Sequence, residues 1–428
     1  MRIALFCLIT LVAILWTFKK PTIGLFYFLI LLFLRDGYLM ERIPEIYTSW
    51  HIPMITGWLI LVAWLCHVAQ KQQKIRVPAE FIAMLLLGIV IYASRWHAAY
   101  PAIAVYMFDE FIRVAMLFFL MINVINNEDD LKQAAGVLVS VIFILVLYAY
   151  YRYKTEGFEY AVPSVYYVDR NFFAESIVAV LPLAFTFYEE SISKWKKILF
   201  LGITGVMAGG IILTYSRGGL LAMVIVLAAL FIKSRKKIMM IVTAILVLII
   251  FLPHIGDKYT GRMGTIATYE EDPSAMIRIA TWRSGINMLE KHTLLGVGAG
   301  NFNDLFIDYA PPEMKKYADY TMSIHNMFLQ IFSETGLLGG GLFIFIIISS
   351  LLGLLRLRKD NNALESDKRM NLALPYALGV SLIGFCGAGF FLPGAYYGYQ
   401  YIIVALLVVS KLIYTDRIKT LIAAKAVK

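Results

Sequence analysis

The chain has 428 residues, of which 60% are hydrophobic and 16% are charged, and its formal net charge is +10. Soluble globular domains are closer to half apolar and a quarter charged. Long apolar runs recur from one end of the sequence to the other, and several could cross a hydrocarbon core of roughly 30 Å. The composition therefore excludes an ordinary soluble protein and predicts an all-α polytopic membrane protein.

The positive charges gather in short segments between the apolar runs, which is the pattern of the positive-inside rule. These segments are Lys19–Lys20, Lys71–Arg76, Lys194–Lys197, Lys233–Lys237 and Arg356–Lys359. Because no basic groove with interleaved aromatic residues accompanies them, we expect no nucleic-acid partner. Cys7, Cys66 and Cys386 fall in predicted spans, which favours small apolar residues over a disulfide framework or a metal site.

Apolar segments of this kind predict 12–13 transmembrane helices. Thirteen candidate spans begin near Ile3, Ile23, Ile52, Phe81, Ile103, Leu131, Asn171, Ile198, Gly218, Ile238, His325, Asn371 and Tyr397. The first two are short and read as an uncleaved membrane hairpin, and the count falls to twelve if one early run is re-entrant. If the basic segments face the cytoplasm, the segments Ser94–Pro101, Tyr151–Arg170, Tyr215–Arg217 and His254–Ile324 face outward.

The predicted spans and the long loop divide the chain into four parts. They are N-terminal transmembrane helices (1–168), core transmembrane helices (169–253), an external, periplasmic catalytic loop (254–324) and C-terminal transmembrane helices (325–428). Connections as long as this external loop are usually functional or disordered, and its aromatic content argues against disorder. Asp272 can cap a helix, Pro273 suits its first position, and Ser274–Lys291 has helical spacing.

Three arginines and one histidine in or beside the external loop suggest chemistry on an anion. Arg217 stands in Thr-Tyr-Ser-Arg-Gly-Gly, Arg278 and Arg283 lie on the predicted loop helix, and His325 stands where the loop re-enters the membrane. Guanidinium groups clamp pyrophosphate oxygens bidentately, and a neutral imidazole can accept a proton from an attacking hydroxyl. Each residue also has an ordinary explanation, as a snorkelling anchor, a surface charge or a helix cap.

Two glycine-rich runs need structural explanations of their own. Gly296, Gly298 and Gly300 have no strand–helix unit around them, so a turn that ends the loop helix is favoured over a dinucleotide-binding motif. Gly336 and Gly339–Gly341 mark either a bend or close helix packing in the membrane.

Several acidic residues are weaker candidates. Glu270–Asp272 read as a solvated face and not as a site for a divalent cation. Asp109 and Arg113 are four residues apart in a predicted span, so they could form an intramembrane pair. Asp169 and Asn171 lie at the outer mouth of a span, where they could contact substrate.

From about Asp169 to Gly341 the sequence resembles the O-antigen ligase family, which includes O-antigen polymerases and protein O-oligosaccharyltransferases. The motifs that carry the resemblance are Asp169-Arg-Asn171, Ser216-Arg217-Gly218-Gly219, Arg278-x-x-x-Trp282, Leu295-Gly296-Val-Gly298-Ala-Gly300-Asn-Phe302, His325-Asn326 and Glu334-Thr-Gly336-Leu-Leu-Gly339. The N-terminal hairpin and general layout also resemble the ligase-like branch found with exosortase systems.

The resemblance implies a GT-C-like glycosyltransferase that uses a glycan on undecaprenyl pyrophosphate as donor. It implies that Arg217 and Arg278 bind the pyrophosphate and that His325 activates an acceptor hydroxyl, with inversion at the sugar and without a metal or other cofactor. Further residues expected to bind substrate are Arg283, Asp169, Asn171, Trp282, Asn326 and Glu334.

The expected acceptor is a lipid A–core sugar, a similar glycolipid or another polysaccharide, and membrane lipids surround the spans. The expected location is a bacterial inner membrane, with the active site facing the periplasm. Two alternatives stay open. A polysaccharide polymerase would use the same donor, and a lipid or polysaccharide transporter would need no catalysis. Transporters tend to have repeated halves, and no repeat is visible in this sequence.

Overall fold

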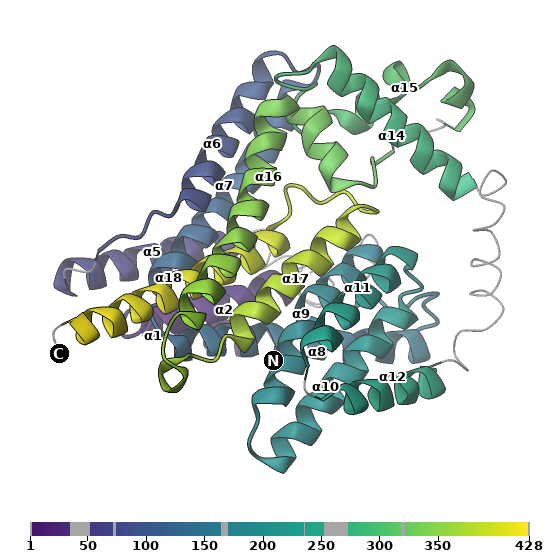
Figure 1. Ribbon diagram of the computed structural model, residues 1–428. Helices are drawn as coiled ribbons and strands as arrows, with labels where there is room; N and C mark the ends of the chain where they lie inside the picture. Colours follow the sequence, from purple (N-terminus) through teal and green to yellow (C-terminus); the bar gives the residue numbers. More distant parts are fainter. Residues whose placement is uncertain are drawn as a thin grey trace.

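The computed structural model describes residues 2–34, 52–71, 74–163, 170–234, 236–251, 273–317 and 322–426. The described residues are almost entirely helical and contain no strand. Thirteen of their helices coincide with the thirteen expected apolar segments (Figure 1). These helices are α1 (Arg2–Thr17), α2 (Pro21–Leu34), α5 (Ile52–Lys71), α6 (Ala79–Ala93), α7 (Pro101–Val124), α8 (Glu128–Thr155), α9 (Arg170–Glu190), α10 (Lys194–Leu213), α11 (Arg217–Lys233), α12 (Lys237–Phe251), α16 (Met327–Asn362), α17 (Ala373–Gly389) and α18 (Gly398–Ala426).

The protein is a polytopic membrane protein with an all-α fold. Among the described residues, five segments are long and apolar enough to cross a membrane by themselves: α6 with the short helix that follows it, α8, α9, α10 and α16. Large apolar side chains such as Ile89, Val224 and Ile249 are exposed on the helices, as expected of surfaces that face lipid. The predicted N-terminal hairpin is present, because α1 and α2 pack against each other and against α5.

The helices pack around a continuous apolar core. In it, α9 lies against α8, α10, α11 and α17, and α16 lies against α6 and α18. An ion pair joins α6 and α18 in this core, where Lys411 of α18 lies 2.6 Å from the buried carboxylate of Glu80 in α6. Gly353 of α16 makes room for the lysine, since a Cβ there would lie 2.7 Å from its Cδ. The predicted pair of Asp109 with Arg113 is wrong: Asp109 is exposed and Arg113 pairs with Glu110.

One end of the molecule gathers several of the expected basic segments. Lys233, in the last turn of α11, stacks 3.7 Å from the ring centroid of Tyr376 in α17. Glu190, at the end of α9, accepts a hydrogen bond from Asn371, and Arg417 of α18 pairs with Glu128 of α8 at 3.3 Å. These contacts join helix ends that the charge pattern assigned to a single side of the membrane.

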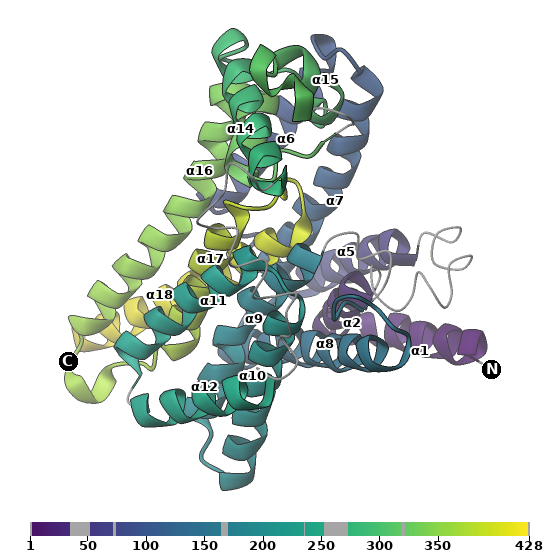
Figure 2. The same cartoon turned by 90° about the vertical axis from the view of Figure 1, so that its right-hand side faces the viewer.

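At the opposite end lies a small head made by the long loop (Figures 1 and 2). It contains α14 (Pro273–Lys291), α15 (Phe302–Tyr309) and η5 (Pro312–Tyr317), a 3-10 helix, beside the ends of α6, α7 and α16. The helix expected from Ser274 to Lys291 is confirmed, with Pro273 at its first position. Asp272, Glu270 and Glu271 lie outside the described residues.

The head has an apolar core of its own, which explains why so long a loop is folded. Eight buried residues form it: Ala280, Met288, Val297, Phe302, Phe306, Ala310, Met314 and Ile324. Fully burying each large side chain of this kind contributes roughly 1.5–3 kcal/mol. The head is therefore a fixed platform for the polar side chains that it carries.

Candidate functional site

The backbone of the glycine run after α14, residues 296–300, hydrogen-bonds to the first part of α16. We call this set of contacts the clasp. Gly296, Gly298 and Gly300 have φ values of +68°, +106° and +73°, in the region that only glycine adopts easily. The amides of Val297 and Gly298 donate to the carbonyls of Ser333 and Glu334, both at 2.9 Å. The turn predicted for this run is confirmed. Because its glycines have no side chains, the backbone of the turn can lie directly against the backbone of α16.

Glu334 closes this clasp from the side of α16. Its carboxylate is 2% exposed and accepts a 2.9 Å hydrogen bond from the amide of Gly300. A Cβ on Gly296 would lie 2.3 Å from the carbonyl carbon of Glu334, so a larger residue would break the contact. The predicted substrate-binding residue Glu334 thus has a structural partner in the head.

α16 bends at Gly336, and the head satisfies the amides that the bend releases. Gly336 has φ +64° and ψ −163°, which interrupts the helical hydrogen bonds. The next two amides, of Leu337 and Leu338, donate to the carbonyls of Thr293 and Leu294 at 2.8 and 3.3 Å. The bend and the clasp therefore depend on each other, and together they fix the head on α16.

The head also docks on the turn between α6 and α7. The amide of Ala299 donates to the hydroxyl of Ser94 at 3.0 Å. The side chain of Asn301 accepts from the amide of Tyr100 at 2.7 Å and donates to its carbonyl at 3.3 Å. These bonds join two segments that the charge pattern placed on the same outer side.

His325 is held in an uncommon backbone conformation directly before α16. Its φ is +47°, and Tyr215 and His325 are the two non-glycine residues of the described chain with positive φ. Asn326 caps α16 by accepting from the amides of Phe328 and Leu329, both at 3.0 Å. Such strain persists when the surroundings impose it, and it is concentrated at functional sites.

Arg278 belongs to the part of α14 that touches the His325 segment. The hydroxyl of Thr281 donates to the carbonyl of Arg278 at 2.9 Å and lies 3.4 Å from the carbonyl of Ile324, the neighbour of His325. Ile324 is 1% exposed, so this segment is anchored in the core of the head. The contacts place Arg278 about one helical turn from the point where α14 meets this segment.

Arg283 and Trp282 differ in their surroundings. Arg283 is exposed and pairs with Glu313 of η5 at 3.7 Å, so its described partner belongs to the head. Trp282 is half-buried against the core of the head, and its indole Nε1 is buried without a hydrogen-bond partner among the described residues. Of these two predicted binding residues, Trp282 has a hydrogen-bond donor, its indole N–H, that no described residue accepts.

Arg217 is the first residue of α11, and the start of α9 supports it. Ser216 caps α11 by accepting from the amide of Gly219 at 3.0 Å, and its hydroxyl donates to Asn171 of α9 at 2.6 Å. Asn171, a predicted substrate-binding residue, thus has a described role in joining two helix starts. Asp169 lies outside the described residues.

Aromatic rings and a second arginine surround this pair of helix starts. The guanidinium of Arg170 lies 4.1 Å from the ring centroid of Tyr160, and Tyr215 packs edge-on against the same ring. Burial, followed by a 3.4 Å contact with the hydroxyl of Tyr153, raises the pKa of Tyr215 to about 12. The Tyr215 hydroxyl therefore stays protonated at neutral pH.

The loop between α17 and α18 contacts both the start of α11 and the start of α16. A Cβ on Gly218 would lie 3.1 Å from the Cβ of Phe391 in that loop. The side-chain oxygen of Gln330, in the first turn of α16, accepts from the amides of Gly394 and Ala395 at 2.9 and 3.2 Å. The residue next to Arg217 and the first turn of α16, which follows His325, therefore contact the same loop.

Sequence reasoning missed the residues that make this assembly possible. Gln330 and Asn301 join separate segments through their amide side chains, and Tyr215 has a left-handed backbone beside Arg217. A polar residue in an apolar run could have drawn attention to Gln330. The backbone conformation of Tyr215 leaves no signal of its own in the sequence.

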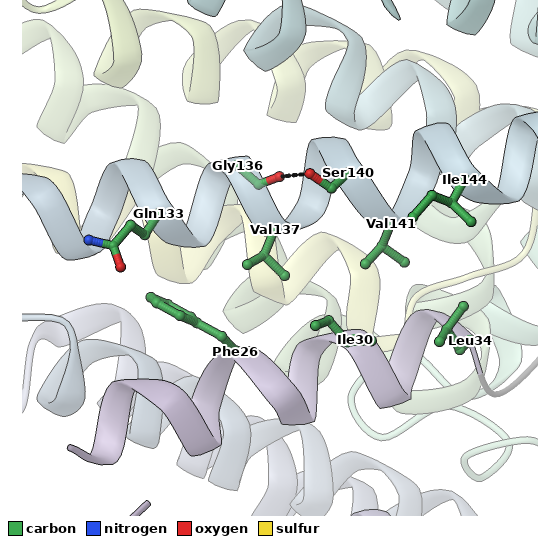
Figure 3. A pocket seen from close by; sticks show the side chains of 9 residues that line it. All are labelled: Phe26, Ile30, Leu34, Gln133, Gly136, Val137, Ser140, Val141 and Ile144. Carbon is green, nitrogen blue, oxygen red and sulfur yellow. Dashed lines mark hydrogen bonds between the residues drawn. The ribbon is translucent and has the colours of Figure 1, made fainter. Parts of the chain in front are cut away.

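A pocket between α2 and α8 lies among the N-terminal helices (Figure 3). Its lining is apolar apart from Gln133 and Ser140, and the Ser140 hydroxyl donates to the carbonyl of Gly136 at 2.8 Å. No described charged side chain lines this pocket. The charged groups suited to chemistry therefore lie in the head and at the starts of α11 and α16, away from this pocket.

Comparison with known protein families gives a match to part of the chain. Residues 202–344 match the model of a family described as O-antigen ligase. The match contains Arg217, Arg278 and His325, and it supports membership of the chain in the O-antigen ligase family. No curated protein matches the chain significantly.

Proposed function

We propose that this member of the O-antigen ligase family transfers a glycan from undecaprenyl pyrophosphate to an acceptor hydroxyl at the periplasmic face of a bacterial inner membrane. The family supports glycosyl transfer of the ligase or polymerase type. The observation that carries the proposal is twofold: the α14 segment around Arg278 touches the segment that precedes His325, and the neighbour of Arg217 contacts the same α17–α18 loop as the first turn of α16. The identity of the donor, the identity of the acceptor and the side of the membrane on which transfer takes place are all part of what we propose.

In the proposed reaction, the acceptor oxygen attacks the anomeric carbon of the donor sugar. The bond between that carbon and the pyrophosphate oxygen breaks, and the lipid pyrophosphate leaves with the bonding electrons. Arg217 and Arg278 stabilise its growing negative charge, because guanidinium groups bind phosphate oxygens bidentately without changing protonation. His325 accepts the proton of the hydroxyl, an effect typically worth about 10²–10⁴-fold in rate.

The remaining predicted binding residues have narrower roles in this proposal. Trp282 offers its buried Nε1–H to a sugar oxygen, and Asn171 and Asn326 keep Arg217 and His325 in position through the contacts described above. Glu334 holds the head on α16. Arg283 and Asp169 stay predictions as substrate contacts.

Reconstitution tests the proposal. Purified full-length protein in nanodiscs would receive an undecaprenyl pyrophosphate-linked oligosaccharide, with and without a lipid A–core glycolipid. We expect release of undecaprenyl pyrophosphate, a glycolipid enlarged by the oligosaccharide, an inverted linkage by NMR and no loss of rate with EDTA. Longer glycans on the carrier itself would identify the polymerase. No covalent change in either substrate, with glycan moved across proteoliposomes, would identify a transporter and contradict glycosyl transfer.

A further inference from the structure

Arg95 is a cation held between aromatic rings at the turn between α6 and α7. It belongs to η2 (Ser94–Trp96), a 3-10 helix at the end of α6. Its guanidinium carbon lies 4.2 Å from the ring centroid of Tyr92 and 5.3 Å from that of Trp96. In the part of the chain that the structure describes, no acidic side chain pairs with Arg95, and its buried Nε has no hydrogen-bond partner.

This arrangement suits recognition of an oxyanion. Stacking on aromatic rings limits the motion of the guanidinium and leaves the N–H groups in its plane available. A planar group with several donors binds phosphate or carboxylate bidentately. An unused, half-buried guanidinium therefore predicts an anionic ligand.

Two exposed aromatic side chains lie in the same turn as Arg95, and one of them, Trp96, contacts the cation. Trp96 is 73% exposed and Tyr100 is 46% exposed. Both have a wide apolar face and a polar atom, which allows them to pack on a sugar ring and to hydrogen-bond its hydroxyls. The turn therefore combines a group for the anion with surfaces for the sugar.

Direct contacts connect this turn to the candidate catalytic head. Ser94, next to Arg95, accepts from the amide of Ala299, and Tyr100 exchanges two hydrogen bonds with Asn301. A Cβ on Gly298 would lie 2.4 Å from the Cβ of Ala98, so the two segments are in close contact. In the same glycine run, the amide of Gly300 donates to the carboxylate of Glu334, which lies nine residues after His325 in the sequence.

We propose that the α6–α7 turn binds a phosphorylated sugar of the acceptor glycan, with Arg95 on the phosphate and Trp96 and Tyr100 against the sugar rings. The inference rests on the proposed function for the identity of the acceptor. Arg217 and Arg278, on other helices, are assigned to the donor pyrophosphate, which leaves Arg95 for a different anion. A lipid headgroup offers the same chemistry, but the docking of the turn on the head favours a glycan at the site of transfer.

Equilibrium binding tests the proposal independently of transfer. The full-length protein in phosphatidylcholine nanodiscs would be titrated with a fluorescently labelled, deacylated lipid A–core oligosaccharide, before and after treatment with phosphatase. We expect the phosphorylated form to bind wild type at least ~10-fold more tightly, by about 1.4 kcal/mol. Arg95→Ala abolishes this preference, Arg95→Lys keeps part of it, and Trp96→Ala weakens the binding of both forms.

Two substitutions at the opposite end of the molecule serve as matched controls. Arg356 and Trp195 are exposed near the basic segments, and Arg356→Ala and Trp195→Ala should bind like wild type. Wild-type affinity and preference in Arg95→Ala would overturn the inference, and so would equal binding of the two forms by wild type. Loss of the preference when phosphatidylglycerol is added to the nanodiscs would assign Arg95 to lipid headgroups instead.

The failure of this inference can be separated from the failure of the proposed function. If wild type transfers glycan and Arg95→Ala changes neither the Kd nor the KM of the acceptor, the inference is wrong and the function stands. If Arg95 confers the preference but wild type transfers no glycan to the bound oligosaccharide, the function is wrong and the turn is still an anionic-glycan site.

Discussion

The Ser216 hydroxyl, which caps α11, donates a 2.6 Å hydrogen bond to the side chain of Asn171, the second residue of α9. Because of this bond, two helices start side by side, and each starts with an arginine, Arg170 or Arg217. Helix starts carry a partial positive charge and unpaired amides, which favour anions. This end of the molecule is therefore electropositive, as a leaving pyrophosphate would require.

Replacing Ser216 by alanine should impair use of the donor. The change removes the cap on the Gly219 amide, worth about 0.5–2 kcal/mol, and the bond to Asn171, so Arg217 loses its fixed position. We expect the donor kcat/KM in the reconstituted assay to fall about 10-fold, which corresponds to about 1.4 kcal/mol. Ser140→Ala is the control, because that hydroxyl binds the Gly136 carbonyl within α8. Wild-type kcat/KM in Ser216→Ala would show that the bond does not position Arg217.

Replacing His325 by alanine should remove the general base. We expect kcat to fall by about 10²–10⁴-fold with little change in the KM of either substrate. His292 provides a matched control in the same head, since its ring bonds the Tyr309 hydroxyl at 2.7 Å and lies outside the proposed site. His292→Ala should stay within about threefold of wild type by the same kinetic measure. An equal loss in both variants would mean that the head had been disturbed and would contradict a specific role for His325.

Much of the fold could be predicted from local features of the sequence. The starts of α2, α5 and α14 follow from apolar run length and from a proline at the first helical position of α14. The bond between Asn171 and Ser216 joins residues 45 positions apart. No periodicity encodes such a pairing, so it had to come from the structure.

The glycine residues show the same limit at the candidate site. Gly296, Gly298 and Gly300 could be assigned to a turn because no strand–helix unit surrounds them. That the turn would clasp α16 depends on the bend at Gly336 and on the buried Glu334 carboxylate. These are tertiary contacts between segments that look unrelated in the sequence.

Substitution of Gly336 should destabilise the attachment of the head. Alanine at this position would have φ +64° and a Cβ 2.3 Å from the carbonyl carbon of Leu294, where the backbone has no room to move. We expect a loss of at least about 2 kcal/mol, from the left-handed conformation and from overpacking. Gly341→Ala meets no atom within 4 Å and, in a helix, should be neutral or stabilising. Thermal unfolding in detergent compares them, and equal melting temperatures would contradict the clasp.

The sidedness of the head can be tested by cysteine labelling in intact spheroplasts. Free Cys7, Cys66 and Cys386 would first be replaced, and single cysteines would then be introduced at Arg283 in the head and at Trp195 at the opposite end. An impermeant maleimide should label position 283 before lysis and position 195 only after it. Labelling in the reverse order would place the head in the cytoplasm and contradict transfer in the periplasm.

The most direct test of glycan transfer is deletion of the gene in the native host, followed by separate sizing of carrier-linked and envelope-attached glycans. We expect long glycans to accumulate on the lipid carrier, with none attached to the acceptor. Wild type and His292→Ala should restore attachment, and His325→Ala should not. Single repeat units stranded on the carrier would identify a polymerase instead, and unchanged glycan pools would contradict the proposed transfer.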